Sequence, residues 1–153
     1  MIDDLYSARI LKLAANMPRA GRLTAPDASS EKISKLCGSK VVVDLVLEDG
    51  AVADFAQDVQ ACALGQAAAA VLGEHVIGAR VDEIEAARDQ LRAMLKAGGP
   101  APEGRFVDLT ALQPVKDYPA RHASTLLAFE AAVEAARLAL SSKVSRTSRA
   151  GAA

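Results

Sequence analysis

The sequence predicts an α+β fold: a small antiparallel sheet with helices packed on one of its faces. Three observations support this prediction. Two alternating apolar runs flank a tight-turn dipeptide, helical apolar periods lie on both sides of them, and no internal repeat is present. The chain has 153 residues, of which 51% are hydrophobic, and this is enough to form one core. We assign residues 1–142 to one domain. Residues 143–153 are small, polar and mildly basic, which predicts a disordered tail.

A helix is expected first, from about Asp4 to Asn16, and Pro18 and Gly21 end it. One side of this helix is apolar and carries Leu5, Ile10, Leu13 and Ala14. Residues 22–31 are predicted to form a polar loop, and Lys32 to Leu36 a short first strand.

The strongest local pattern is a β-hairpin. One alternating run spans Lys40 to Leu47, a second spans Ala51 to Gln60, and Asp49-Gly50 between them is a strong hairpin signal. Side chains alternate in direction along a strand. One face of the first run therefore carries Val41, Val43, Leu45 and Leu47, and the other carries Asp44 and Glu48.

Three helices are expected after the hairpin. They cover Cys62 to about Ile77, Val81 to Ala97, and Ser124 to about Leu140. A loop rich in glycine and proline, residues 98–104, separates the last two, and a partly ordered stretch follows it to Tyr118-Pro119.

Composition argues against several functions. The net charge is −1, aromatic residues make up 3% of the chain, and tryptophan is absent. Neither a basic surface nor base-stacking side chains support nucleic-acid binding. The longest apolar run, Ala67 to Leu72, is far below the roughly 20 residues of a membrane span. The acidic start does not resemble a signal peptide, so we expect a cytoplasmic protein without a membrane partner.

Two cysteines carry the chemistry that the sequence suggests. Cys37 and Cys62 are 25 positions apart (62 − 37), but they bracket the hairpin and can therefore share one site. Glycine after Cys37 lets the backbone bend close to an ion, and the start of a helix at Cys62 offers unpaired N–H groups. Thiols in the cytoplasm are normally reduced. Metal ligands or reactive thiols are one interpretation, and inert turn or core cysteines are the other.

His122 is the third candidate, since a neutral imidazole before the last helix could bind a metal. Ser124 explains the same local pattern differently, as an N-cap. His75 is expected at a helix surface, and no phosphate loop, Ser-His-Asp order or CxxC motif is present. The residues alone thus indicate a cytosolic α+β domain with a candidate Cys/Cys/His site.

Four segments, in order, resemble the NifU-like family of iron–sulfur cluster assembly scaffolds, which includes the IscU and SufU types. The resemblance runs from about Leu5 to Ala139. The four segments are Leu5-Tyr6-Ser7 with the turn of residues 16–21, Cys37-Gly38 before the hairpin, Cys62 at a small-residue helix, and Pro119-Ala120-Arg121 through Leu126-Leu127-Ala128.

This resemblance implies a fold and a function. The family fold is a three-stranded antiparallel sheet with helices packed on it. Family members receive sulfur from a cysteine desulfurase and serve apo iron–sulfur acceptor proteins. IscU types assemble a [2Fe–2S] cluster on three cysteines with an Asp nearby, whereas SufU types bind zinc and relay sulfur. The longer segment from Gly98 to Tyr118 resembles the SufU arrangement.

The chain departs from the family at the ligands. Ser39 stands in place of the ligand-loop Asp. Aligned without a gap, the third cysteine falls on Ser124; a one-residue shift places it on Ala123 and the family histidine on His122. With the third cysteine absent, the resemblance implies Cys37, Cys62 and His122 as ligands, and Ser39 and Ser124 as weaker candidates.

Three functions remain open from the sequence. The first is a scaffold or carrier that holds iron or a [2Fe–2S] cluster through Cys37 and Cys62, with His122. The second is a zinc-bound sulfur acceptor, with the persulfide on either cysteine. The third is an adaptor of the assembly machinery that lost the site. In the first and third the protein is a binding protein and no enzyme.

Overall fold

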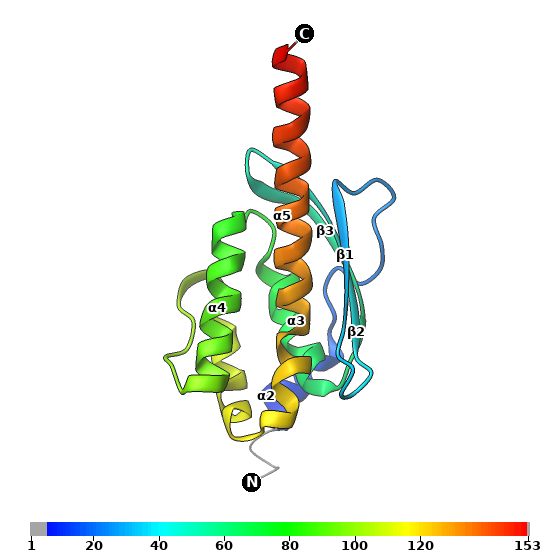
Figure 1. The fold of residues 1–153 in the computed structure, drawn as a ribbon. Coiled ribbons are helices and arrows are strands. Elements are labelled where there is room, and N and C mark those ends of the chain that lie inside the picture. Colours follow the sequence, from blue (N-terminus) through cyan, green and yellow to red (C-terminus); the bar gives the residue numbers. More distant parts are fainter. Residues whose placement is uncertain (1–5, 153) are drawn as a thin grey trace.

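Three strands and the helices around them make up the protein. The computed structural model describes the backbone of residues 6–152 and the side chains of residues 6–143. The elements are α2 (Ala8–Ala15), β1 (Ala28–Ile33), β2 (Lys40–Glu48), β3 (Ala51–Gln60), α3 (Ala63–His75), α4 (Val81–Ala97), the 3-10 segments η1 (Gly104–Asp117) and η2 (Pro119–Arg121), and α5 (His122–Ala152) (Figure 1).

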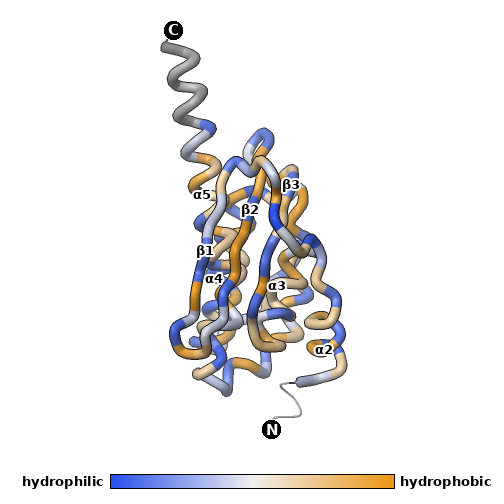
Figure 2. Tube along the Cα trace, turned by 90° about the vertical axis from the view of Figure 1, so that its right-hand side faces the viewer, coloured by the Kyte–Doolittle hydropathy of each residue, from blue (hydrophilic) through white to orange (hydrophobic). Residues whose placement is uncertain are grey.

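The sheet is antiparallel, with the order β1-β2-β3, so β2 is central. Helices α3 and α5 pack against the sheet and against each other, and α4 packs on α5. Figure 2 shows the largely apolar course of β2, with the helices behind the sheet. The predicted α+β class, with helices on one face, is therefore confirmed.

The predicted hairpin is present, with its turn at Asp49-Gly50, where both residues have positive φ. The predicted inward face of β2 is buried: Val41, Val43, Leu45 and Leu47 are at most 1% exposed. Helix α4 has the predicted bounds, Val81–Ala97. Helix α3 spans Ala63–His75, so it begins one residue later and ends two residues earlier than predicted.

Asp44 shows what lies on the opposite face of the sheet. Its side chain is fully buried, because the loop before β1 folds over it. Arg22 donates two hydrogen bonds to the carboxylate, with its Nε 2.6 Å from Oδ2, and Leu23 N and Ser29 Oγ complete the shell. Burial by itself would raise the pKa of Asp44, but these donors outweigh it and lower that pKa.

The first strand was predicted too late in the chain. The structure pairs Ala28–Ile33 with β2, whereas the prediction covered Lys32 to Leu36. The polar residues 28–31, predicted as a loop, join the sheet because they extend its edge beside an apolar strand. Residues 34–39 instead form the connection to β2, and this shift places Cys37 within a tight loop.

The first and the last helix both depart from their predicted bounds. The first helix, predicted from about Asp4 to Asn16, spans Ala8–Ala15, because Ser7 caps its start with Oγ accepting from Ile10 N. Tyr6 lies in a turn before it, and residues 1–5 lie outside the description. The backbone of α5 continues past the predicted end at Leu140 to Ala152, since no proline or glycine interrupts it before Gly151. The division into a domain of residues 1–142 and a tail of residues 143–153 stays a prediction, and Ala153 lies outside the description.

Candidate cysteine site

Three segments that are distant in sequence meet at one end of the molecule, the lower end in Figure 1. They are the loop between β1 and β2, the junction of β3 with α3, and the start of α5. The antiparallel hairpin explains the first two, since its outer ends return to the same edge. This arrangement places the segments that carry Cys37 and Cys62 at the same end of the molecule.

Cys37 lies in a closed loop. Ser34 N donates to Ser39 O, and Gly38 N donates to Ser34 O, each at 2.8 Å. Gly38 adopts a φ of 74°, a left-handed conformation that glycine takes without strain. The loop leaves Cys37 exposed at its tip, while Ser34 and Ser39 are buried beneath it.

Hydroxyl groups surround the Cys37 sulfur. Ser39 Oγ is 3.0 Å and Ser34 Oγ is 3.5 Å from Sγ. Hydrogen bonds between Cys37 and the side chains of Ser34 and Ser39, then one with the Ser39 backbone, lower the pKa of Cys37 to about 7. Ser124 contributes less, and burial opposes the shift. An exposed thiol that is half ionised near neutral pH is both a good ligand and a good nucleophile.

Cys62 is the N-cap residue of α3 and is partly buried. Its Sγ is 3.5 Å from Ser124 Oγ in the first turn of α5. Ser124 is also near enough to Cys37 to influence its pKa. The Ser124 hydroxyl therefore lies near both cysteines, and it donates to Arg121 O at 3.2 Å.

Gly65 allows this close approach of α3 to α5. A Cβ at this position would lie 2.9 Å from Ala61 Cβ and 3.0 Å from the Ser124 carbonyl oxygen. The first distance is too short for a real Cβ, and the second would force the Ser124 carbonyl to move by a few tenths of an ångström. The small residue at this position thus sets the spacing of Cys62 and Ser124.

His122 lies apart from this cluster of hydroxyls and thiols. Its ring is buried, and Nε2 is 2.9 Å from Val115 O and 3.2 Å from Lys116 O. These contacts join the start of α5 to the end of η1. His75, expected at a helix surface, is about one-third exposed and contacts Asp108 at 3.0 Å.

The ligand set that the sequence implied is only partly assembled. Among the described side chains, no group of three or more His, Cys, Asp or Glu residues could hold a metal ion. Two thiols come together with the hydroxyls of Ser39 and Ser124. Ser34 was missed by the sequence analysis, although its position three residues before Cys37 is a typical spacing for a side chain that closes a turn.

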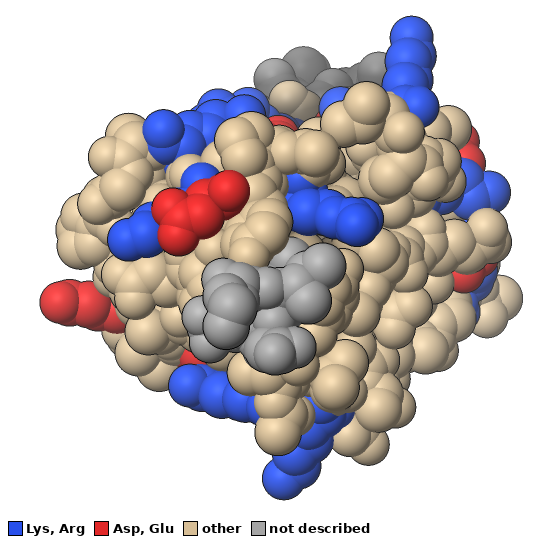
Figure 3. All heavy atoms as spheres, turned by 90° about the horizontal axis from the view of Figure 1, so that it is seen from below, with Lys and Arg blue, Asp and Glu red and all other residues tan. Residues whose placement is uncertain are grey.

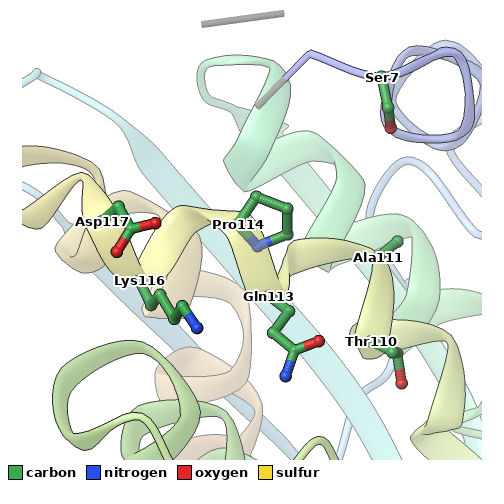
Figure 4. A pocket seen from close by; sticks show the side chains of 7 residues that line it. All are labelled: Ser7, Thr110, Ala111, Gln113, Pro114, Lys116 and Asp117. Carbon is green, nitrogen blue, oxygen red and sulfur yellow. The ribbon is translucent and has the colours of Figure 1, made fainter. Parts of the chain in front are cut away.

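A separate hollow of about 610 Å³ lies between the start of α2 and η1. Its side chains are spread along the rim and include no thiol or imidazole (Figure 4). It is lined by Ser7, Thr110, Ala111, Gln113, Pro114, Lys116 and Asp117.

The fold and the paired cysteines define a class: a small α+β domain that presents thiols at the end of a three-stranded sheet. The sequence pattern of the NifU-like N terminal domain matches residues 5–125. The chain is 31% identical over 131 residues to the iron–sulfur cluster assembly scaffold protein IscU of Thermotoga maritima, covering 86% of this chain and 92% of that protein.

Two solved structures are similar as well. The N-terminal part of a nitrogen-fixing NifU-like protein from Brucella abortus has a TM-score of 0.90 and 55% identity, covering 92% of this chain and 97% of that one. A putative SUF-system cluster assembly scaffold from Fervidobacterium islandicum has a TM-score of 0.80 at 22% identity, covering 88% and 98%, and supports the fold alone. The chain belongs to the NifU-like family of iron–sulfur cluster assembly scaffolds, as the sequence predicted.

The family consists of scaffold proteins and not, in general, of enzymes. Across the described residues, no helix is both long and apolar enough to cross a membrane.

Proposed function

We propose that this protein is an iron–sulfur cluster scaffold or carrier that binds its cargo through Cys37 and Cys62. The observation that carries the proposal is the convergence of both thiols on the Ser124 hydroxyl, from three separate elements. Thiolates are the usual protein ligands of iron in such clusters. A cysteine desulfurase is the proposed sulfur source, and apo iron–sulfur proteins are the proposed recipients.

The serines take a supporting role in this proposal. A hydroxyl is a weak ligand for iron beside a thiolate. Ser39 and Ser34 instead form hydrogen bonds with the Cys37 sulfur, and the Ser124 hydroxyl lies 3.5 Å from the Cys62 sulfur. Hydrogen bonds to cluster-bound sulfur stabilise the negative charge that accumulates there.

His122 is proposed to be structural. With Nε2 directed at two carbonyl oxygens of η1, that nitrogen is committed as a donor and cannot bind a metal at the same time. Its function in this proposal is to fix the start of α5, and with it Ser124.

The test is the iron and acid-labile sulfide content of protein purified without oxygen, with a visible spectrum. We expect iron, sulfide and thiolate charge-transfer bands, and we expect them to be lost in Cys37→Ala and in Cys62→Ala. Ser30→Ala is a matched control, because this buried serine on β1 has no hydrogen-bond partner among the described residues. Unchanged metal content in both cysteine variants would refute the proposal.

A second candidate function is transfer of sulfur through Cys37. Its exposure and its lowered pKa favour this, since the thiolate is the attacking species. The Cys37 thiolate would attack the outer sulfur of a desulfurase persulfide. A new S–S bond forms on Cys37, the desulfurase S–S bond breaks, and the departing thiolate takes a proton from water.

Resident zinc does not fit the described side chains. Zinc sites in proteins normally use three or four nitrogen, sulfur or carboxylate ligands, and two thiols fall short of that number. Sulfur transfer is therefore tested without metal, by incubating the protein with a desulfurase and ³⁵S-labelled cysteine. Label on Cys62→Ala but not on Cys37→Ala supports this candidate. Protein that takes up neither cluster nor label corresponds to the adaptor hypothesis.

A further inference from the structure

Helix α5 keeps one face open. The sheet covers one side of this helix and α4 packs on another, so most of its described side chains are buried. Glu130, Glu134, Arg137 and Ser141 are partly or fully exposed, and their spacing of three and four residues places them in one stripe, the α5 stripe. Leu138, which is 48% exposed, lies beside it. A hollow of about 300 Å³ between β1, α4 and α5 is lined by this stripe.

The charge of α5 changes sign along the helix. Its charged residues are, in chain order, Glu130, Glu134, Arg137, Lys143, Arg146 and Arg149. Two α5 helices that run antiparallel side by side therefore place the acidic half of each against the basic half of the other. The midpoint of α5, which spans His122–Ala152, is Arg137 and lies next to the change of sign. A twofold axis near this point matches the two helices over their whole length.

The strand beside this face has a free edge. Among the described residues, β1 pairs with β2 alone. Ser34 N donates to Ser39 O at 2.8 Å, and in an antiparallel pair this pattern recurs at every second residue. The backbone N–H and C=O groups of Ser29, Glu31 and Ile33 therefore point away from β2, where a further strand can bind them.

The charges on this edge do not guard it. Free charges on an edge strand normally keep other strands from pairing with it. Here Lys32 contacts Glu134 on α5, and Lys40 Nζ is 3.6 Å from Glu31 Oε1. Each charge of β1 is thus paired within its own chain.

We propose that two copies of this chain pair side by side through β1 and α5, about a twofold axis near the middle of both elements. The two β1 edges run antiparallel and continue the sheet, and the two α5 stripes face each other on its helical side. Leu138 of each copy is covered in this arrangement. The cysteine ends of the copies point in opposite directions, so this inference does not depend on the proposed cluster chemistry.

The dimensions of the two elements agree with a single axis. Lys143 Nζ is 3.2 Å from Asp27 Oδ2, just before β1, and Lys32 near the end of β1 contacts Glu134. The middle of β1 therefore lies beside residues 135–142, which include the midpoint of α5 (Figure 1). Paired strands are about 4.8 Å apart. Because α5 packs over both β1 and β2, pairing of the β1 edges brings the two α5 axes to about 10 Å, a normal distance between packed helices.

The cysteine end of the molecule suits a second copy less well. More Lys and Arg than Asp and Glu side chains are visible on that end in Figure 3. Two copies that meet end to end would therefore repel each other. The α5 stripe carries both signs, and two copies related by a twofold axis attract each other there.

Sedimentation equilibrium of the whole chain, reduced and free of metal, measures this pairing. We expect the average mass to rise with protein concentration from one chain, 15.9 kDa, toward twice that value, and we expect added salt to weaken the dimer. The double variant Cys37→Ala/Cys62→Ala should pair equally well, which separates this dimer from any that forms through a metal. A mass that stays at one chain at every concentration would overturn the proposal and leave the cluster chemistry untouched.

Charge reversal tests the facing stripes. Glu134→Arg and Arg137→Glu should each weaken the dimer by at least about tenfold, because like charges then meet across the axis. The double variant should regain the wild-type dimer strength. Its contacts within the chain, Lys32 with Glu134 and Glu85 with Arg137, stay broken, so only contact between copies explains such a rescue. A double variant as weak as the single ones would show that the stripes do not face each other.

Two leucines on α5 give a matched pair of variants. Leu138→Asp places a charge beside the axis and should weaken the dimer by at least about tenfold. Leu140→Asp is the control, since Leu140 is 39% exposed on the same helix but lines a different hollow, beside Gly50 and Arg80. Equal dimer strength in the two variants would contradict the proposed contact.

Discussion

The reactivity of Cys37 follows directly from the hydroxyl groups around it. With a pKa of about 7, roughly half of this thiol is ionised at pH 7. An ordinary cysteine with a pKa of about 8.5 would be about 3% ionised at the same pH. The expected difference in thiolate fraction is therefore roughly fifteenfold at neutral pH.

The assay uses the two-cysteine composition of the chain. Cys62→Ala leaves Cys37 as the single thiol, and its rate of alkylation by iodoacetamide is measured from pH 5 to pH 10. We expect a midpoint near pH 7 in the folded protein and near 8.5 in urea. The midpoint is the decisive quantity, because intrinsic nucleophilicity falls as the thiol pKa falls and compresses differences in rate.

Ser39→Ala should move this midpoint upward. The variant loses the hydroxyl 3.0 Å from Sγ but keeps the backbone N–H that also lowers the pKa of Cys37, so the shift is partial. Ser30→Ala should leave the midpoint unchanged, because Ser30 is a buried serine without a hydrogen-bond partner among the described residues. The same alkylation midpoint in the folded protein and in urea would refute the claim that the loop lowers the pKa of Cys37.

The same pKa has a consequence for stability. A thiol whose pKa is lowered on folding contributes stability above its unfolded pKa and loses it as pH falls through the folded value. The stability advantage of the wild type over Cys37→Ala should therefore grow between about pH 7 and pH 8.5. Denaturant unfolding at several pH values measures this difference.

Three further predictions concern the frame around the site. Gly65→Ala should destabilise the protein by about 1–3 kcal/mol in thermal unfolding, because the new Cβ meets the facing helix; a gain in stability would contradict this. Arg22→Ala should destabilise the protein near neutral pH, because it removes two hydrogen bonds to the buried Asp44 carboxylate, and the gap to wild type in denaturant unfolding should shrink in acid as Asp44 becomes protonated. His122→Ala should lose about 1–2 kcal/mol with its bond to Val115 O, yet keep its iron content per folded chain; loss of iron from a folded variant would make His122 a ligand.

Much of the fold was predictable because its signals are local. The turn at Asp49-Gly50 and the alternation from Val41 to Leu47 specify a hairpin without reference to the rest of the chain. The placement of β1 was not predictable in this way, since residues 28–31 are polar. They become a strand because β2 offers unpaired hydrogen-bonding groups along its edge.

The sequence likewise predicted only some of the polar contacts described above. The two cysteines and their positions at the ends of the hairpin were evident from the sequence. The burial of Asp44 was not, since it depends on a loop that brings Arg22 over the sheet. The direction of the His122 ring was likewise undetermined, because it depends on how η1 packs against α5.

The sequence by itself determined the class of fold, the family and the supply of two thiols, because these depend on short-range patterns and residue identities. Only the tertiary structure decided which side chains meet. It turned Ser124 toward Cys62, directed His122 to backbone carbonyls, and closed the Cys37 loop over two serines. These contacts join residues up to 62 positions apart, and packing between elements, such as the close approach at Gly65, sets their distances.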